Sequence, residues 1–372
     1  MTSPTLVGQS EAMLIVTGSA GFIGSHIARN YDQRARILLI DDPRAFRENN
    51  YFGPRLPTEW DRVRAIQPDQ RHKILDHHYF PKILEKLGPE YAELTKEILP
   101  RGERIEAVLH IGAITDTSKD RDPVEMHKWN TEYSQMLWKW CALHRVPFLY
   151  ASSAATYGLG EQGFSDDHAI ISKLKPLNPY AQSKQDFDAW VVRELESGAP
   201  TPPNWWGLKF FNVYGPCEGH KGRMASTILF SFRAIRERGA CPLFRSHKPG
   251  IADGEQKRDF VFVDDLVKIV DFLLESKTAS GIYNAGSGQA RSFHDMARAV
   301  FTSLGVPEKI EWIDTPPAFR ESYQYFTEAR MEKLRAVGYK NKFVTLEAGV
   351  ESYVRWLEKS LDSEALNFPG AN

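Results

Sequence analysis

The sequence predicts an α/β protein, a doubly wound parallel sheet followed by a smaller C-terminal α/β domain. Two observations support this prediction. Short apolar runs alternate along the chain with stretches of helical periodicity, and the first apolar run leads directly into a glycine-rich turn. Alternating strands and helices are typical of a parallel sheet, because each helix carries the chain back to begin the next strand. The 372 residues suffice for one large or two closely joined domains.

The first strand and the turn after it suit a nucleotide. Residues 13–16 are apolar, and Gly18, Gly21 and Gly24 follow at intervals of three before a helix that continues through 25–28. Glycines let a pyrophosphate approach the backbone, and a helix N-terminus offers it free N–H groups. The spacing differs from the common G-x-G-x-x-G fingerprint, so a purely structural turn stays an alternative.

The second strand, 36–41, ends in a carboxylate. Asp41 stands where an acidic residue commonly binds the ribose hydroxyls of a dinucleotide, although Asp41 and Asp42 could simply form a strand-end turn. Arg44 and Arg47 follow and could neutralise a 2′-phosphate. The residues therefore leave NAD and NADP both open.

The chain between this strand and the middle of the sequence is less regular. Residues 43–72 predict a surface excursion before a short strand at 73–76, and 79–100 have helical spacing. A fourth strand, 107–113, runs into a turn of small residues. A helix is expected over 124–143, on which Asn130 is either a buried polar brace or a solvated side chain.

Composition excludes several classes of function. A net charge of -1 and a pI near 6.8 give no electrostatic reason to expect a nucleic acid or membrane partner. Cys141, Cys217 and Cys241 lie far apart, which predicts reduced thiols in a cytoplasmic protein and neither a disulfide framework nor a metal site. Residues 1–12 are expected to form a loose tail and not a signal peptide. No apolar run approaches the length of a membrane span.

The residues that suit proton transfer concentrate in the middle of the chain. A fifth strand, 147–151, ends beside Ser153, and Asn178 with the following proline is a favourable start for a helix. On that helix Tyr180 and Lys184 share one face. A tyrosine has a pKa of about 10, and a neighbouring ammonium favours its phenolate. Ser153 could hydrogen-bond the reacting oxygen. Tyr-x-x-x-Lys occurs often by chance, but its position after a nucleotide turn and a Ser-Ser strand end favours a catalytic role.

Longer segments extend this pattern into a resemblance. Several longer segments resemble the ADP-L-glycero-D-manno-heptose 6-epimerases. These segments are Phe148 to Gly158, Phe211 to Pro216, Glu218 to Gly222, Met224 to Ser226 and Lys257 to Val261, with Tyr323-Gln324 and Phe326-Thr327. This family belongs to the extended short-chain dehydrogenase/reductases that modify nucleotide sugars. The resemblance covers roughly residues 13 to 357, and His220-Lys221-Gly222 is its most specific part. It implies a Rossmann-type fold, an isomerase, NADP bound once per subunit (NAD possible), and a homo-oligomer such as a pentamer.

The resemblance also implies roles for matching residues. The implied catalytic residues are Tyr180, Lys221, Lys184 and Ser153. The implied cofactor site comprises Gly18, Gly21, Phe22, Ile23, Gly24, Asp41, Asp42, Arg47, Asn130, Tyr180, Lys184 and Val213. The implied substrate site comprises Ser153, Asn212, Lys221, Arg223, Phe244, Arg258 and Tyr323. In this scheme Tyr180 and Lys221 are the two acid/base groups, and Arg258 offers the planar fork that suits phosphate oxygens.

Departures from the family lie around the expected sugar-nucleotide pocket. Arg223 stands where the family usually has Ser, Phe230 where it has His, and 245–247 where it has Glu-Gly-Ser. Residues 43–72 and 248–255 resemble insertions. These differences put the identity of the sugar nucleotide in question more than the reaction type.

Domain limits and rival functions complete the predictions. The cofactor domain is expected over 13–212 and 258–284, the substrate domain over 213–257 and 285–360, and tails over 1–12 and 361–372. A nucleotide-sugar 4,6-dehydratase would carry an acidic pair where this chain has Ala154 and Ala155. A 4-epimerase is harder to exclude, and Lys221 speaks against it. A protein that only senses the cofactor and catalyses no reaction would not need all four of the implied catalytic residues, Ser153, Tyr180, Lys184 and Lys221.

Overall fold

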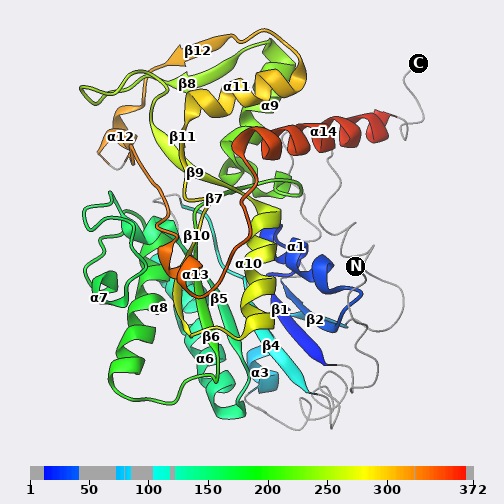
Figure 1. The fold of residues 1–372 in the computed structure, drawn as a ribbon, viewed down its shortest axis with the longest axis vertical. Coiled ribbons are helices and arrows are strands. Elements are labelled where there is room, and N and C mark those ends of the chain that lie inside the picture. The colour runs from blue at the N-terminus through cyan, green and yellow to red at the C-terminus, as the bar shows by residue number, and fades with distance from the viewer. Residues whose placement is uncertain are drawn as a thin grey trace.

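The computed structural model describes residues 12–41, 73–78, 80–84, 104–117, 122–321 and 323–365. Its centre is a seven-stranded sheet in which every pairing is parallel (Figure 1). The strands in spatial order are β3 (Lys73–Asp76), β2 (Arg36–Asp41), β1 (Met13–Thr17), β4 (Ile105–His110), β5 (Phe148–Ser153), β6 (Trp205–Phe210) and β10 (Gly281–Ala285). This is the 3-2-1-4-5-6 order of the dinucleotide-binding Rossmann fold with one strand added. The predicted fold class is confirmed.

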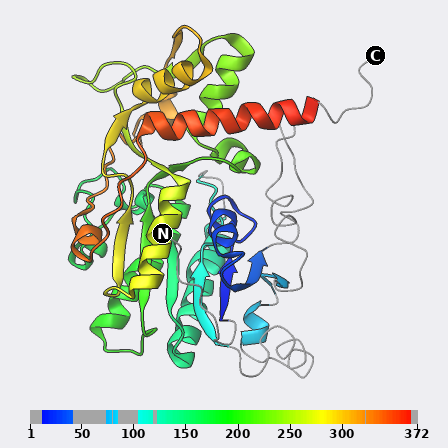
Figure 2. The same cartoon turned by 45° about the vertical axis from the view of Figure 1, so that its right-hand side comes forward.

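Helices cover both faces of this sheet. α1 (Phe22–Tyr31) packs against α10 (Val263–Ser276), and α6 (Tyr133–His144) and α8 (Pro179–Glu196) lie with α3 (Phe80–Leu84) on the other side (Figures 1 and 2). Because both faces are covered, β1 and β10 are buried throughout and read as nearly continuous apolar runs. β6 is also fully buried, yet it includes Lys209. A buried lysine in such a strand needs a partner.

The helix expected over 124–143 consists of three segments, two α-helical and one π-helical. α5 (Pro123–Met126) continues into a π-helix (His127–Glu132) and then into α6. A π-turn adds a residue to the ordinary helical spacing and often occurs at a functional site. Asn130 lies in this π-turn and is completely buried.

A smaller unit with its own apolar core follows (Figures 1 and 2). Its strands form a three-stranded sheet of β7 (Asn212–Tyr214), β9 (Lys257–Phe262) and β11 (Ala290–Ser292), and a pair of β8 (Cys241–Phe244) and β12 (Ile310–Ile313). Its helices are α9 (Thr227–Arg238), α11 (Phe293–Leu304) and α14 (Leu346–Ala365). Shorter helices are α7 (His168–Ile171), α12 (Pro317–Arg320) and α13 (Glu332–Ala336), with 3-10 turns at Ala154–Tyr157 and Gly219–Met224.

The return of the chain to the large sheet differs from expectation in one strand. β10 pairs with β6 of the large sheet, whereas β9, most of which lies in the range 258–284 expected for the cofactor domain, pairs with β7 and β11. Val261 packs into the core of the large unit, whereas Phe260 and Phe262 pack into the core of the small one. Alternate side chains of a strand point to opposite sides. β9 therefore forms part of the seam between the two units.

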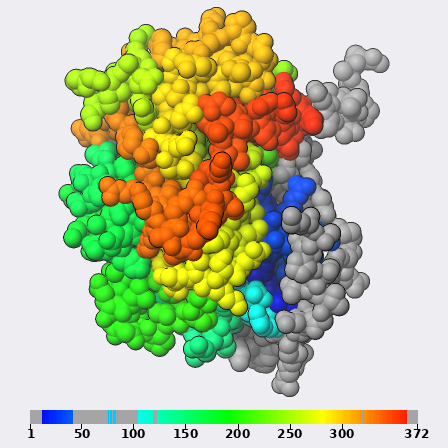
Figure 3. Space-filling view, in the orientation of Figure 1, coloured from blue at the N-terminus to red at the C-terminus, as the bar shows by residue number. Residues whose placement is uncertain are grey.

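The C-terminal part of the chain crosses this seam again. After β12 the segment drawn in orange extends over the front of the molecule, and α13 packs on β10 of the large sheet (Figure 3). The two units are thus joined by several chain crossings. No helix in the described part of the chain is long and apolar enough to cross a membrane.

Candidate active site

A cleft of about 430 Å³ lies at the seam, beyond the carboxyl ends of the strands. In a doubly wound sheet this edge is where ligands bind. The cleft is lined by segments from both units, among them the strand end at 151–155, the start of α8, β7 and the turn at 219–224. It brings together these residues predicted from the sequence: Ile23, Ser153, Tyr180, Lys184, Asn212, Val213, Lys221 and Arg223.

The glycine turn beside this cleft has the form that a dinucleotide requires. Gly18 has a φ of +68°, and a Cβ on it would lie 2.5 Å from the Cα of Gly112. A Cβ on Gly24 would lie 2.0 Å from the carbonyl oxygen of Gly18. Gly21 is the N-cap of α1, which has neither a side-chain cap nor an acidic residue in its first turn, so its N–H groups can receive an anion.

Asp41 closes the same turn from the end of β2. Its carboxylate accepts a hydrogen bond from the backbone N–H of Ala20 at 2.7 Å. The carboxylate therefore lies next to the glycine turn, as expected for a residue that contacts the ribose of a bound dinucleotide. The residues of the turn fit such a cofactor. Asp42, Arg44, Arg47 and the excursion at 43–72 lie outside the described residues.

Tyr180, Lys184 and Ser153 form one group at the wall of the cleft. Asn178 caps α8 by accepting the N–H of Ala181 at 2.8 Å, which fixes the first turn that carries Tyr180. Burial raises the pKa of the Tyr180 phenol, and its hydrogen bond with Ser153 offsets part of that rise. Lys184 is buried, and its Nζ donates to the carbonyl oxygen of Ala151 at 2.8 Å.

The charge on Lys184 is easily changed. Burial lowers the pKa of its ammonium from 10.5 to about 8, against the opposing attraction of Asp188. A lysine with a pKa near 8 still carries a proton at neutral pH. It can therefore favour the phenolate of Tyr180.

A buried ion pair stabilises the elements that carry Tyr180, Lys184 and Ser153. Asp188 lies one helical turn after Lys184, and Lys209 faces it from β6 with Nζ 2.6 Å from Oδ2. Both side chains are fully buried. Tyr150 and Ser152 of β5 donate to the same carboxylate at 3.0 and 2.6 Å. The pair thus ties the strand end before Ser153 to α8, and every charge in it has a partner.

Asn130 acts as a brace on the cofactor side of the cleft. Its amide pairs with both the N–H and the C=O of Ile114, at 2.8 and 2.9 Å, and donates to Ser183 Oγ at 2.9 Å. Of the two alternatives for Asn130, a buried polar brace or a solvated side chain, the structure shows the buried brace. These bonds hold the turn after β4 against α8. Its contact with a cofactor stays a prediction.

Lys221 lies in the 3-10 turn Gly219–Met224 of the smaller unit and lines the cleft from that side. The preceding Glu218 is completely buried and accepts hydrogen bonds from the N–H and the hydroxyl of Ser226. Nζ of Lys221 lies 5.5 Å from the centre of the Phe22 ring, on the first turn of α1. Lys221 and Tyr180 thus line one cleft from two different units.

Sequence comparison agrees with this arrangement. The model of the NAD dependent epimerase/dehydratase family matches residues 14–286. The chain belongs to this family. It is 39% identical over 353 residues to the ADP-L-glycero-D-manno-heptose-6-epimerase of Fusobacterium nucleatum, covering 92% of this chain and 97% of the relative. It is 46% identical over 350 residues to the enzyme of the same name from Nitratidesulfovibrio vulgaris, with the same coverage. The resemblance predicted from the sequence is confirmed, as is the enzyme class of epimerase.

A solved structure supports the fold of this epimerase family member. The ADP-L-glycero-D-manno-heptose-6-epimerase of Helicobacter pylori superposes with a TM-score of 0.69 at 22% identity, covering 94% of this chain and 97% of that one. At this identity the likeness concerns the fold. The family and the glycine turn together indicate a nicotinamide cofactor.

A second cavity of about 260 Å³ adjoins the cleft in the smaller unit of the epimerase. Phe293 and Thr227 line both cavities. Phe244, Arg258 and Tyr323, all predicted to face the substrate, line the second one. The guanidinium of Arg258 lies 5.4 Å from the ring of Phe293 and 5.5 Å from that of Tyr323. An aromatic pocket with one guanidinium suits a flat base joined to phosphate.

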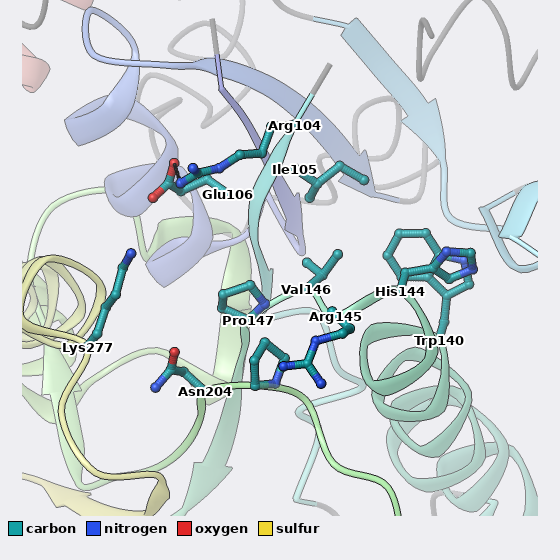
Figure 4. Close-up of a pocket in the computed structure, with 11 residues that line it drawn as sticks. Arg104, Ile105, Glu106, Trp140, His144, Arg145, Val146, Pro147, Asn204 and Lys277 are labelled. Atoms are coloured by element: carbon teal, nitrogen blue, oxygen red, sulfur yellow. Dashed lines mark hydrogen bonds and ion pairs between the residues drawn. The ribbon is translucent and has the colours of Figure 1, made fainter. Parts of the chain in front are cut away.

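A larger hollow of about 560 Å³ lies at the opposite end of the sheet, near the starts of β4, β5 and β6 (Figure 4). Arg104, Arg145 and Lys277 surround it, and Glu106 pairs with Arg104 at 3.3 Å. None of the residues predicted to act on a ligand lines this hollow. Size alone therefore does not identify the active site of this epimerase.

Sequence analysis missed several supporting residues. Lys209 was detectable as the one lysine in an apolar strand, and Asp188 as the residue one turn beyond Tyr180-x-x-x-Lys184. Glu218 and Phe293 carried no such signal. Their burial and their place in the cleft follow from contacts between distant segments.

Proposed function

We propose that the protein inverts C6 of the heptose in ADP-glycero-manno-heptose, by oxidation to a 6-ketone and reduction from the other face. The observation that carries the proposal is the meeting of Tyr180 and Lys221 in one cleft, on opposite units of the fold. The names of the relatives at 39% and 46% identity support the choice of substrate. The aromatic cavity with Arg258 offers a place for the ADP end.

Tyr180 is the first acid/base group. Its phenolate oxygen takes the proton of the 6-hydroxyl while Ser153 holds the reacting oxygen by a hydrogen bond, and the Lys184 ammonium stabilises the phenolate. When bound, the nicotinamide cofactor supplies the hydride acceptor for the oxidation and the hydride donor for the reduction. Because hydride moves at one fixed place, the sugar must present its opposite face before reduction.

Lys221 is the second acid/base group. After the sugar has turned, the ketone oxygen points away from Tyr180, and a proton donor is required on the other side. The Lys221 ammonium supplies that proton, and the neutral amine that remains takes one in the reverse direction. A lysine in water has a pKa of about 10.4, so the cleft must lower the pKa of Lys221 for it to act as a base.

The remaining predicted residues bind substrate. Asn212 and Arg223 line the reacting part of the cleft and would contact the sugar. Arg223 also pairs with Asp116 at 3.2 Å, which keeps its guanidinium at the mouth. Arg258, Phe244 and Tyr323 would hold the diphosphate and the base.

We expect the cofactor to be NADP, held through the whole cycle. The support is Arg44 and Arg47 after Asp41, together with the preference of the family that the chain resembles. The Asp41 carboxylate favours the free 2′-hydroxyl of NAD, so NAD is the competing outcome. Chromatography of dinucleotide extracted from the pure protein distinguishes them, and NAD alone would refute the assignment.

The biological setting that we propose follows from the substrate. ADP-heptose with inverted C6 would supply heptose precursors for a lipopolysaccharide core from the cytoplasm. Cys141, Cys217 and Cys241 are separate, buried thiols, as suits a reducing compartment. The family resemblance implies a homo-oligomer such as a pentamer, which native mass spectrometry tests.

Two substitutions test the mechanism. Tyr180→Phe and Lys221→Met should each slow epimerisation of ADP-heptose by about 10³-fold or more, near the upper range for loss of an acid/base group. Cofactor content and the melting temperature should stay close to those of the parent. Arg223→Ser, at the mouth of the same cleft, serves as a control that changes KM more than kcat. Near-parental turnover of Lys221→Met would overturn the two-base assignment.

A further inference from the structure

His26 joins the cofactor helix to two other parts of the fold. It lies on α1, one turn after Phe22. Its Nε2 lies 3.0 Å from the carbonyl oxygen of Pro216 and 3.4 Å from Sγ of Cys217. Its Nδ1 lies 3.5 Å from Oδ1 of Asp264 at the start of α10. One imidazole thus connects α1, α10 and the loop that leads to Lys221.

Both nitrogens can donate only when the ring is protonated. Burial by itself lowers the pKa of His26, but the bonds with Asp264 and Cys217 outweigh it and raise the pKa to about 9. The polar side chains facing the ring are the Asp264 carboxylate on α10 and the Cys217 thiol on the loop, and Arg29 and Lys268 act on Asp264. At neutral pH the imidazolium can therefore donate to Asp264 and to Pro216 together.

The contacted loop has an unusual backbone at this point. Cys217 has a φ of +72°, a left-handed conformation that only a few non-glycine residues adopt. This bend turns the Pro216 carbonyl and the Cys217 thiol toward the same imidazole. Such a conformation persists only where surrounding contacts impose it.

α1 touches the loop a second time through Lys221. The ammonium of Lys221 lies over the ring of Phe22, and that ring makes an edge contact with His26 at 5.9 Å. The same helix begins at the glycine turn. The loop is therefore fastened at two points to the element that fits the cofactor.

We propose that His26 is a positioning residue, which clamps the loop of Lys221 to α1 so that the second acid/base group keeps its place relative to the cofactor turn. The proposal rests on the acid/base role proposed for Lys221. His26 does not line the cleft, so it acts through the loop and not on the substrate.

The clamp predicts a dependence on pH. Because the pKa of His26 is raised above its ordinary value, the stabilising effect of the clamp is fully present below about pH 6.5 and is lost as the pH rises through about 9. Above that pH the ring has one N–H left and cannot donate to both partners. The loop at 216–224 should then open more often.

The test compares His26→Ala with Asn30→Ala on the holoenzyme. Asn30 also joins α1 to α10, through two bonds to Asp271 at 2.8 and 2.9 Å, but it does not touch the loop. Amide hydrogen exchange of peptides covering 216–224 should be about 10-fold faster in His26→Ala than in Asn30→Ala at pH 7, the loss expected for a charge-assisted hydrogen bond. Epimerisation of ADP-heptose should slow by about 10- to 100-fold in His26→Ala only, because small misplacements are costly.

A third variant distinguishes loss of the His26 clamp from general destabilisation of the fold. Asp264→Asn keeps the imidazole but removes the carboxylate, so the pH at which exchange of 216–224 accelerates should fall by about one unit or more. Equal exchange in His26→Ala and Asn30→Ala, or no pH shift in Asp264→Asn, would overturn the clamp. Faster exchange with unchanged turnover would uphold the clamp and count against the acid/base role of Lys221.

Discussion

The buried pair of Lys209 and Asp188 gives the sharpest test of how the site is held. Lys209→Met keeps most of the side-chain volume in β6 but removes the cation 2.6 Å from the carboxylate. Asp188 would keep two hydroxyl donors, from Tyr150 and Ser152, and no opposite charge at hydrogen-bond distance. Thr156 would lose the ammonium that donates to it at 2.7 Å.

The expected loss is large because neither partner reaches water. Removing one member of a fully buried pair costs about 3–5 kcal/mol, since the other charge stays buried. With an unfolding entropy of about 2.1 cal/mol/K per residue over 372 residues, this corresponds to a fall in Tm of about 4–6 °C. Turnover should fall as well, because the pair holds the strand end before Ser153 against the helix of Lys184.

Thermal unfolding of cofactor-loaded protein measures the effect, with Lys175→Met as the matched control. Lys175 pairs with Glu161 at 3.2 Å, and both side chains are at least half exposed, so water can replace the ammonium. That control should lose less than about 1 kcal/mol. The double variant Lys209→Met with Asp188→Leu should recover part of the loss, since neither member of the pair is left buried without the other. A loss in Lys209→Met as small as in the control would refute the reasoning.

Three further predictions concern the cofactor side. Gly24→Ala should lower the dinucleotide content of the purified protein at least several-fold, because its Cβ would meet the Gly18 carbonyl at 2.0 Å; a full complement of cofactor would contradict the tight turn. Turnover should decline above about pH 8 as Lys184 loses its proton, and in Lys184→Arg this decline should begin at a higher pH. If the pH of the decline does not change in Lys184→Arg, the decline must come from another group. Asn130→Ala should cost about 2–4 kcal/mol in urea unfolding, since both backbone groups of Ile114 lose their partner, and a loss under about 1 kcal/mol would show that water replaces the amide.

The local sequence determined the elements that carry the chemistry. Apolar runs marked β1, β2, β4 and β5, and the glycine triplet marked the turn into α1, because strand burial and turn conformation impose short-range patterns on the chain. Asn178 with Pro179 placed the start of α8 within the sequence, and helical spacing put Tyr180 and Lys184 on one face. The resemblance added Lys221, which local pattern alone would have left as a loop lysine.

Only the tertiary structure decided which distant residues meet. His26 and Cys217 are 191 positions apart, and Lys209 and Asp188 belong to a strand and a helix whose packing no local period encodes. The π-turn at Asn130 and the place of β9 in the smaller sheet also depend on neighbours from other segments. Periodicity tells which side of an element is buried, whereas the partner on that side is fixed by how the whole chain packs.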